Sequence, residues 1–288
     1  MKTKTHVIIL FLFPLLFFRC SSVDSAITTY AAKNFEESME VVYKESDLKL
    51  ARQFLSSNMM TIRIVLSKDP DNKKMNLFAA RSFGAYAMAF IEETNKERAE
   101  KLYQRGLNYA IQSLPDNKKF STKVSNDTLK TILKKYRKGE VPNLFWLAYN
   151  WGKMIMLDPD SPSNLMNLSK VVEIMSRCKE LNEEYYFAGV DLFYGLYWTS
   201  RPKMLGGNPE KGKKYLKKAF RLNNKKLYLA KYYLAKYYAP RINDEQLFDK
   251  LIQDILQFDL DKYPNYRLMN AMAQHKAKQL KSNKKNYF

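Results

Sequence analysis

Few side chains in this sequence are of a type that carries covalent chemistry. The 288 residues include 2 His and 2 Cys, which excludes most metal sites and most histidine-dependent catalysis. His275 is the single histidine after residue 19, and no nucleophile–base pair or metal-ligand cluster can be identified. Cys178 lies in a helical pattern and is interpreted as a small packing residue. The sequence therefore predicts a protein that is not an enzyme and needs no cofactor or metal, with catalysis by paired carboxylates alone as the open alternative.

One segment resembles a nucleotide-binding loop but lacks its essential features. Residues 207–214 nearly spell G-x-x-x-x-G-K-[ST], yet Lys214 replaces the hydroxyl residue that would bind magnesium. Pro209 lies inside the segment, and no strand is predicted before it. Nucleotide binding is therefore rejected.

The same region contains apolar residues in a loop that should be exposed. Gly206 and Gly207 permit backbone angles closed to other residues. Met204 and Leu205 are expected either to line or gate a cavity, or to fill a hole in the core below. Arg201 is expected either to pair with a ligand carboxylate or to pair with a neighbouring helix or its terminus.

A pair of amides near the C-terminus also admits two interpretations. Asn270 and Gln274 are four positions apart and so share one helix face. Buried amides need hydrogen-bond partners, so the pair could fasten the last helix to its neighbours. Alternatively, the two side chains could face a pore.

The elements that position these residues are predicted to be helices. Glycine and proline are scarce, at 9 and 10 residues, which argues against an all-β protein with many tight turns. Apolar residues recur at spacings of three and four, as at Leu144, Leu147 and Trp151. Helix start signals precede several amphipathic runs, at Asp69-Pro70, Asp160-Ser161-Pro162, Asn208-Pro209 and Asn243-Asp244-Glu245.

Pairs of small residues repeat along the chain in the manner of tetratricopeptide (TPR) hairpins. A small residue lets two helix backbones approach at their crossing, while aromatic residues fill the surrounding space. Each hairpin leaves one face unburied, so hairpins stack. The pattern predicts an all-α single domain of α-solenoid type, with a generic helical bundle as the alternative. The paired crossing positions are Ala87 with Ala99, Ala148 with Leu168, Gly195 with Gly212, and Ala235 with Leu247.

The N-terminus reads as an export signal, residues 1–19, ahead of a folded domain over residues 20–288. Lys2 and Lys4 precede an apolar run from Val7 to Phe18, which is too short for a typical membrane span of about 20 residues. Cys20 follows, as in a bacterial lipoprotein, where this cysteine is acylated.

Arg19 departs from the small residue that normally precedes the acylated cysteine. The alternatives to lipidation at Cys20 are an uncleaved N-terminal anchor and cleavage near Ala26. All three place the folded part outside the cytoplasm.

The chain is strongly basic, with a formal net charge of +20. Residues 201–236 contain twelve basic residues against Glu210, and residues 118–138 contain eight against Asp127. The export signal argues against nucleic acid as the partner. A solvated basic face, an acidic partner protein and an anionic lipid surface remain as interpretations.

One segment is specific enough to suggest a family. It reads Tyr197-Trp198-Thr199-Ser200-Arg201-Pro202-Lys203-Met204-Leu205-Gly206-Gly207-Asn208-Pro209-Glu210-Lys211. This string resembles the hallmark loop of the T component of TPR-associated TRAP transporters (tripartite ATP-independent periplasmic transporters). Similar segments follow the family's order at residues 102–107, 144–146, 185–189 and 267–274.

The resemblance implies a non-catalytic periplasmic lipoprotein, held to a membrane through acylated Cys20, with a pore through each protomer of a trimer. It implies a periplasmic solute-binding protein as partner and uptake of a small ligand, with hydrophobic molecules as one class. Arg19, directly before Cys20, and the high positive charge of the chain both depart from the family pattern. The candidates for contact with a ligand or pore are Trp198, Arg201, Met204, Leu205, Gly206, Gly207, Asn270 and Gln274.

Two other functions compete with this one. The first is a TPR adaptor that scaffolds proteins of the cell envelope and handles no ligand. The second is a basic protein that binds an anionic polymer, whose binding would weaken steeply with salt.

Overall fold

The computed structural model describes residues 28, 30–31, 33–158 and 161–288. The predicted export signal, Cys20 and the alternative cleavage site near Ala26 lie outside the described residues. Over the described ranges the secondary structure is helical and contains no strand. The predicted all-α class is therefore confirmed.

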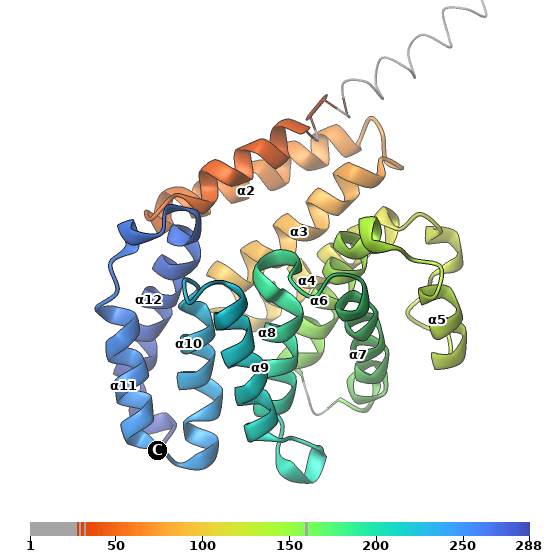
Figure 1. The fold of residues 1–288 in the computed structure, drawn as a ribbon. Helices are drawn as coiled ribbons and strands as arrows, with labels where there is room; N and C mark the ends of the chain where they lie inside the picture. Colours follow the sequence, from red (N-terminus) through yellow and green to blue (C-terminus); the bar gives the residue numbers. More distant parts are fainter. Residues whose placement is uncertain (1–27, 29, 32, 159–160) are drawn as a thin grey trace, which may run out of the picture.

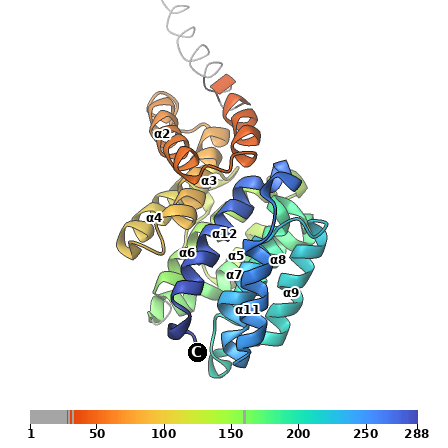
Figure 2. The same cartoon turned by 90° about the vertical axis from the view of Figure 1, so that its left-hand side faces the viewer.

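The helices follow one another as antiparallel pairs (Figure 1). Residues 33–43 are helical and lead into α2, which lies across one end of the molecule. Short connections join the later helices, and α12 returns to pack on α10, α11 and α2 (Figure 2). The bounds are α2 Leu48–Leu66, α3 Lys73–Phe90, α4 Lys96–Ser113, α5 Asn126–Leu133, α6 Val141–Leu157, α7 Pro162–Asn182, α8 Tyr185–Thr199, α9 Pro209–Leu222, α10 Leu229–Tyr233, a π-helical segment Leu234–Tyr238, α11 Glu245–Leu256 and α12 Arg267–Ser282.

Three of the four predicted start signals coincide with helix N-termini. The signal at residues 160–162 is followed by α7 from Pro162, although Asp160 itself lies outside the described residues. Asn208 and Asp244 accept hydrogen bonds from the backbone N–H groups of Lys211 and Leu247, and so cap α9 and α11. The signal at Asp69-Pro70 is displaced, because Asn72 caps α3 instead. Side-chain oxygens at these positions satisfy N–H groups that the first helical turn leaves without partners.

Helices α8 and α9 pack in close contact where they cross at Gly195 and Gly212, as the sequence predicts. A Cβ built on Gly212 would lie 2.8 Å from the Gly195 carbonyl oxygen and 3.0 Å from the Thr199 backbone nitrogen. A Cβ on Gly195 would likewise overlap Leu216. A side chain at position 212 would displace the α8 backbone, and one at position 195 would displace Leu216, so these two glycines allow the helices to approach this closely.

Two features of the backbone have no counterpart in the predicted hairpins. Tyr186, Phe187 and Ala188 adopt left-handed angles, with φ of 50°, 57° and 56°, and kink the start of α8. The π-helical segment interrupts the element that begins at α10. Both irregularities border the cavity described next, and π-turns are frequent at functional sites.

The buried side chains form two hydrophobic clusters. One is built on α2, α3, α4 and the C-terminal helices, and the other on α5, α6, α7 and the facing sides of α3, α4 and α8. Tyr149 and Met154 on α6 pack against both clusters. The boundary between the clusters therefore runs along α6.

Candidate functional site

A large apolar cavity opens at the boundary between the two clusters. Its volume is about 440 Å³, within the range of about 300–1,000 Å³ that is usual for small-molecule sites. Helices α6 and α8 supply half of its lining residues. The α8–α9 loop, the α10–α11 turn, α3, α7, α10, the π-helical segment and α12 supply the rest. The lining residues are Met88, Phe145, Tyr149, Gly152, Lys153, Ile155, Met156, Leu165, Leu168, Tyr186, Gly189, Leu192, Phe193, Leu196, Tyr197, Ser200, Arg201, Pro202, Leu205, Leu229, Tyr233, Tyr237, Arg241 and Met269. We call this the central cavity.

Four of these lining residues are exposed and mark where the central cavity meets solvent. They are Leu165 at the start of α7, Pro202 and Leu205 in the α8–α9 loop, and Arg241 in the α10–α11 turn. Figure 1 shows this loop and this turn at the end of the molecule opposite α2. We call these four residues the mouth.

Helical periodicity explains which side chains reach the cavity. On α6, Tyr149, Lys153 and Met156 are separated by four and three positions and so share one face. On α8, Leu192 and Leu196 share a face in the same way. The opposite faces of both helices are buried in the hydrophobic clusters, which fixes the cavity walls.

The loop after α8 is held rigidly at the mouth. The Pro202 carbonyl accepts hydrogen bonds from the N–H groups of Leu205 (3.0 Å) and Gly207 (2.9 Å). Gly206 has a φ of 80°, a left-handed angle that favours glycine. A Cβ on Gly207 would lie 2.9 Å from the Pro202 carbonyl oxygen and closer still to that of Arg201. Both glycines are thus required by the loop geometry.

The loop turns its two apolar residues in different directions. Leu205 lines the central cavity, whereas Met204 is 90% exposed and lies outside the lining. Met166 on α7 is also strongly exposed, beside the mouth residue Leu165. The rim of the cavity therefore presents apolar side chains to solvent.

Arg201 lies in the cavity wall and is fixed by its own helix and loop. Its guanidinium stacks 3.7 Å from the centre of the Tyr197 ring. It donates hydrogen bonds to the carbonyls of Tyr197 (3.0 Å) and Gly206 (3.4 Å). The contact with the α8 C-terminus is the one expected of a cation near carbonyls that lack helical partners.

The other predicted site residues lie outside the cavity lining. Trp198 packs beneath Lys211, whose ammonium is 3.8 Å from the indole ring centre, and its indole N–H is buried without a hydrogen-bond partner among the described residues. Asn270 accepts from the Tyr228 N–H and donates to the Lys226 carbonyl. Gln274 donates to the Ile255 and Phe258 carbonyls. Both amides join α12 to neighbouring loops, while Met269 reaches the cavity.

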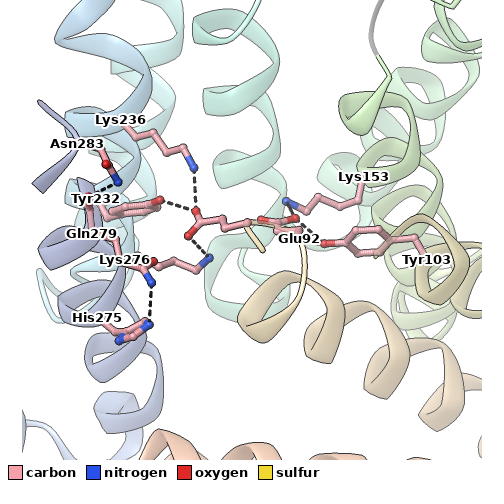
Figure 3. Close-up of polar contacts among 10 residues, drawn as sticks. Glu92, Tyr103, Lys153, Tyr232, Lys236, His275, Lys276, Gln279 and Asn283 are labelled. Atoms are coloured by element: carbon pink, nitrogen blue, oxygen red, sulfur yellow. Dashed lines mark hydrogen bonds and ion pairs between the residues drawn. The ribbon is translucent and has the colours of Figure 1, made fainter. Parts of the chain in front are cut away.

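A buried network of charges borders the cavity on the side of α6 (Figure 3). Lys153 lines the cavity and pairs with Glu92 at 2.6 Å, and the Tyr103 hydroxyl donates to the same carboxylate. Neighbouring Glu93 accepts from Tyr232 (2.9 Å) and Lys236 (2.8 Å), and Lys276 lies 3.2 Å away. We call these residues the Glu92–Glu93 cluster.

The lysines of the Glu92–Glu93 cluster favour the ionised form of Glu93. Burial alone would raise the pKa of Glu93, but Lys276 and Lys236 lower it to about 2. Burial also raises the pKa of Tyr149 and Tyr233, which line the cavity, well above its ordinary value. Both tyrosines thus remain protonated and can donate hydrogen bonds.

Sequence reasoning missed the Glu92–Glu93 cluster, the lining tyrosines and Arg241. The cluster joins residues from the α3–α4 turn, α6, the π-helical segment and α12, and no local pattern signals such distant pairing. A usable signal was the Glu92-Glu93 pair directly after the apolar α3, together with Lys153 at an otherwise apolar face of α6.

A second buried carboxylate lies on the opposite side of α8. Asp191 is fully buried, and neither of its oxygens has a hydrogen-bond partner in the described part of the chain. Lys218 lies 3.7 Å away and is shared with Glu183, while Lys179 lies near Glu183. Burial raises the pKa of Asp191 to about 6, although Lys218 opposes the shift and Glu183 adds to it.

Replacing Asp191 by asparagine is expected to stabilise the protein at pH 7.5 by about 1–2 kcal/mol, since each pKa unit is worth about 1.4 kcal/mol. The folded-state pKa exceeds the unfolded value of 3.8, so the native protein loses stability as pH rises from 4 to 6. The variant should lose that dependence. Urea unfolding at several pH values measures both effects.

Asp71→Asn is the control for this change, because Asp71 is exposed and the substitution alters net charge equally. A less stable Asp191→Asn protein at pH 7.5 would show instead that the carboxylate forms a favourable ion pair.

The described residues contain no group of three or more His, Cys, Asp or Glu side chains placed to hold a metal ion. Cys178 is buried, and burial raises the pKa of its thiol, which disfavours the nucleophilic thiolate. Within the described ranges, no helix combines the length and apolar character that crossing a bilayer requires.

Comparison with known proteins agrees with the hallmark loop. An uncharacterized protein of Treponema pallidum (strain Nichols) is 22% identical over 266 residues, covering 86% of this chain and 82% of that protein. The family model of the TRAP transporter T-component matches residues 44–288, which include every helix from α2 to α12. The chain thus belongs to the TRAP transporter T-component family.

Proposed function

We propose that this protein is a non-catalytic accessory of a TRAP transporter that binds a small apolar ligand in its central cavity. The observation that carries the proposal is the cavity itself, whose wall is apolar and aromatic apart from a few polar groups. Membership of the family, which is a transport family and not an enzyme family, supports the transport role.

The rim of the cavity supports exchange of the ligand with a partner protein. Leu165, Met166, Met204 and Leu205 are large apolar side chains with 44–90% of their surface exposed. Exposed apolar residues around an opening are a common feature of surfaces that contact another protein. A periplasmic solute-binding protein is the partner that the family implies, and it would meet the cavity at this rim.

Location and assembly complete the proposal. The N-terminal sequence supports export and attachment to a membrane through acylated Cys20, with the folded domain in the periplasm. A trimer is proposed from the family resemblance.

Filling the cavity tests whether it binds the ligand. Leu192→Trp is expected to weaken binding of the neutral dye N-phenylnaphthylamine by about ten-fold or more, since even one extra methylene in a filled site costs about 1–3 kcal/mol. The measurement is dye fluorescence on titration with protein, with circular dichroism to establish that the variant is folded.

Leu50→Trp is the matched control, because Leu50 is half exposed on α2 and the change adds the same side chain. A folded Leu192→Trp protein that binds the dye as well as the native chain would contradict a ligand role for the cavity. That result would favour the alternative, a TPR scaffold of the cell envelope without a ligand of its own.

A further inference from the structure

The charged side chains that line the central cavity are all cationic. Its lining contains Lys153, Arg201 and Arg241, and no acidic residue is among the described residues that line it. In an apolar site a few charged groups fix the orientation and chemical class of the ligand. The inference below rests on the proposed function and concerns what the ligand must carry.

The three cations differ in whether they are already neutralised. Lys153 is largely buried and pairs with Glu92 at 2.6 Å, so its charge is balanced within the protein. Arg201 and Arg241 form no ion pair with a carboxylate of the described chain. Their hydrogen bonds go to backbone carbonyls, and each guanidinium has five N–H donors, so several remain for a ligand.

The two arginines are held at the same place. Arg241 is a mouth residue and donates a hydrogen bond of 2.7 Å to the Ser200 carbonyl, next to Arg201 in the chain. Stacking on Tyr197 and the bond to Gly206 restrict Arg201. A restricted guanidinium loses less conformational freedom when it binds an anion, and its planar fork matches carboxylate and phosphate oxygens.

We propose that the central cavity takes an anionic amphiphile, with its apolar chain inside and its anionic head group at the mouth on Arg201 and Arg241. The apolar walls formed by α6 and α8 accept the hydrocarbon. The head group remains beside solvent, which avoids the cost of burying a charge fully. A carboxylate or a phosphate monoester would satisfy the same two guanidinium groups.

The test compares ligands that share one hydrocarbon chain and differ in the head group. Dodecanoate, dodecyl phosphate, dodecanol and dodecyltrimethylammonium displace N-phenylnaphthylamine from the native protein at pH 8, below their micelle concentrations. We expect one or both anions to bind about ten-fold more tightly than the alcohol, and the cation to bind more weakly than the alcohol. The two anions distinguish a carboxylate from a phosphate head group.

Variants at the mouth assign the preference to the two arginines. Arg201→Gln with Arg241→Gln should remove the preference for anions while dodecanol binds as before. Lys203→Gln is the matched control, because Lys203 is an exposed cation of the same loop that does not line the cavity. Arg201→Lys with Arg241→Lys keeps the charge and should retain part of the preference.

The outcomes separate this inference from the proposed function. Equal binding of dodecanoate, dodecyl phosphate and dodecanol by the native protein would overturn the anionic class and leave the cavity as a ligand site. An anion preference that persists in the Arg201→Gln, Arg241→Gln protein would also overturn the assignment. No binding of any of the four would remove the proposed function together with this inference.

Discussion

Replacing Glu93 by glutamine is expected to lower the free energy of unfolding by about 3–5 kcal/mol, the usual cost of removing one partner from a buried ion pair. The substitution leaves Lys276, which is 5% exposed, without its nearest counter-charge. The amide oxygen can still accept from Lys236 and Tyr232, but it carries no charge to balance the Lys236 ammonium. Urea unfolding followed by far-ultraviolet circular dichroism measures the loss.

The pH dependence gives an independent check on Glu93. Its folded-state pKa of about 2 lies below its unfolded value of 4.5, so its contribution is complete above pH 4.5 and is lost as pH falls towards 2. The glutamine variant should show less of this loss than the native protein. The difference in free energy of unfolding between the native protein and the glutamine variant should be largest at neutral pH.

Two variants serve as controls for Glu93→Gln. Glu97→Gln removes an exposed carboxylate that pairs with Lys101, and should change the free energy of unfolding little, because solvent screens exposed ion pairs. Adding Lys276→Met to the Glu93→Gln protein removes the stranded charge and should restore part of the stability. A Glu93→Gln protein as stable as Glu97→Gln would contradict the ion-pair interpretation.

Replacing Gly212 by alanine is expected to cost about 1–3 kcal/mol, as overpacking of a close contact does, despite the gain of about 1 kcal/mol in helix propensity. The added methyl group meets the backbone of Gly195 and Thr199, which no side-chain rotation can relieve. Helices α8 and α9 must separate, and the loop at the mouth connects them. The measurement is thermal and urea unfolding.

Gly139→Ala is the matched control for this crossing. A Cβ at Gly139 meets nothing within 4 Å, so the change should be neutral or slightly stabilising. If Gly212→Ala is as stable as Gly139→Ala, the two helices are not held at the distance that the structure shows.

The sequence was sufficient to predict features that depend on local spacing. Gly195 and Gly212 were predicted to form a crossing because both are small residues flanked by aromatic and apolar positions, with a longer loop between them than in the other hairpins. The structure places their helices in contact. Asn208 and Asp244 were identified as helix starts because their side chains cap the following turn. These predictions need only the geometry of one or two neighbouring helices.

Features that depend on distant residues could not be predicted in the same way. Glu93 in the α3–α4 turn and Lys276 on α12 are far apart in the sequence, and only the folded chain brings them to 3.2 Å. The direction of Asn270 and Gln274 depends on which loops lie beside α12. Arg201 and Leu205 were proposed as ligand contacts from the loop alone, and their place in the cavity wall depends on α6 and α7 as well.

The position of the cavity between two separately buried clusters has a consequence for divergence within the family. Met156 lines the cavity and belongs to neither cluster, so exchanging it reshapes the interior without disturbing the packing that keeps either half folded. The ligand selectivity of the cavity can therefore change between relatives while the fold is retained. Under the proposed function, relatives with the same architecture are therefore expected to bind ligands of different size.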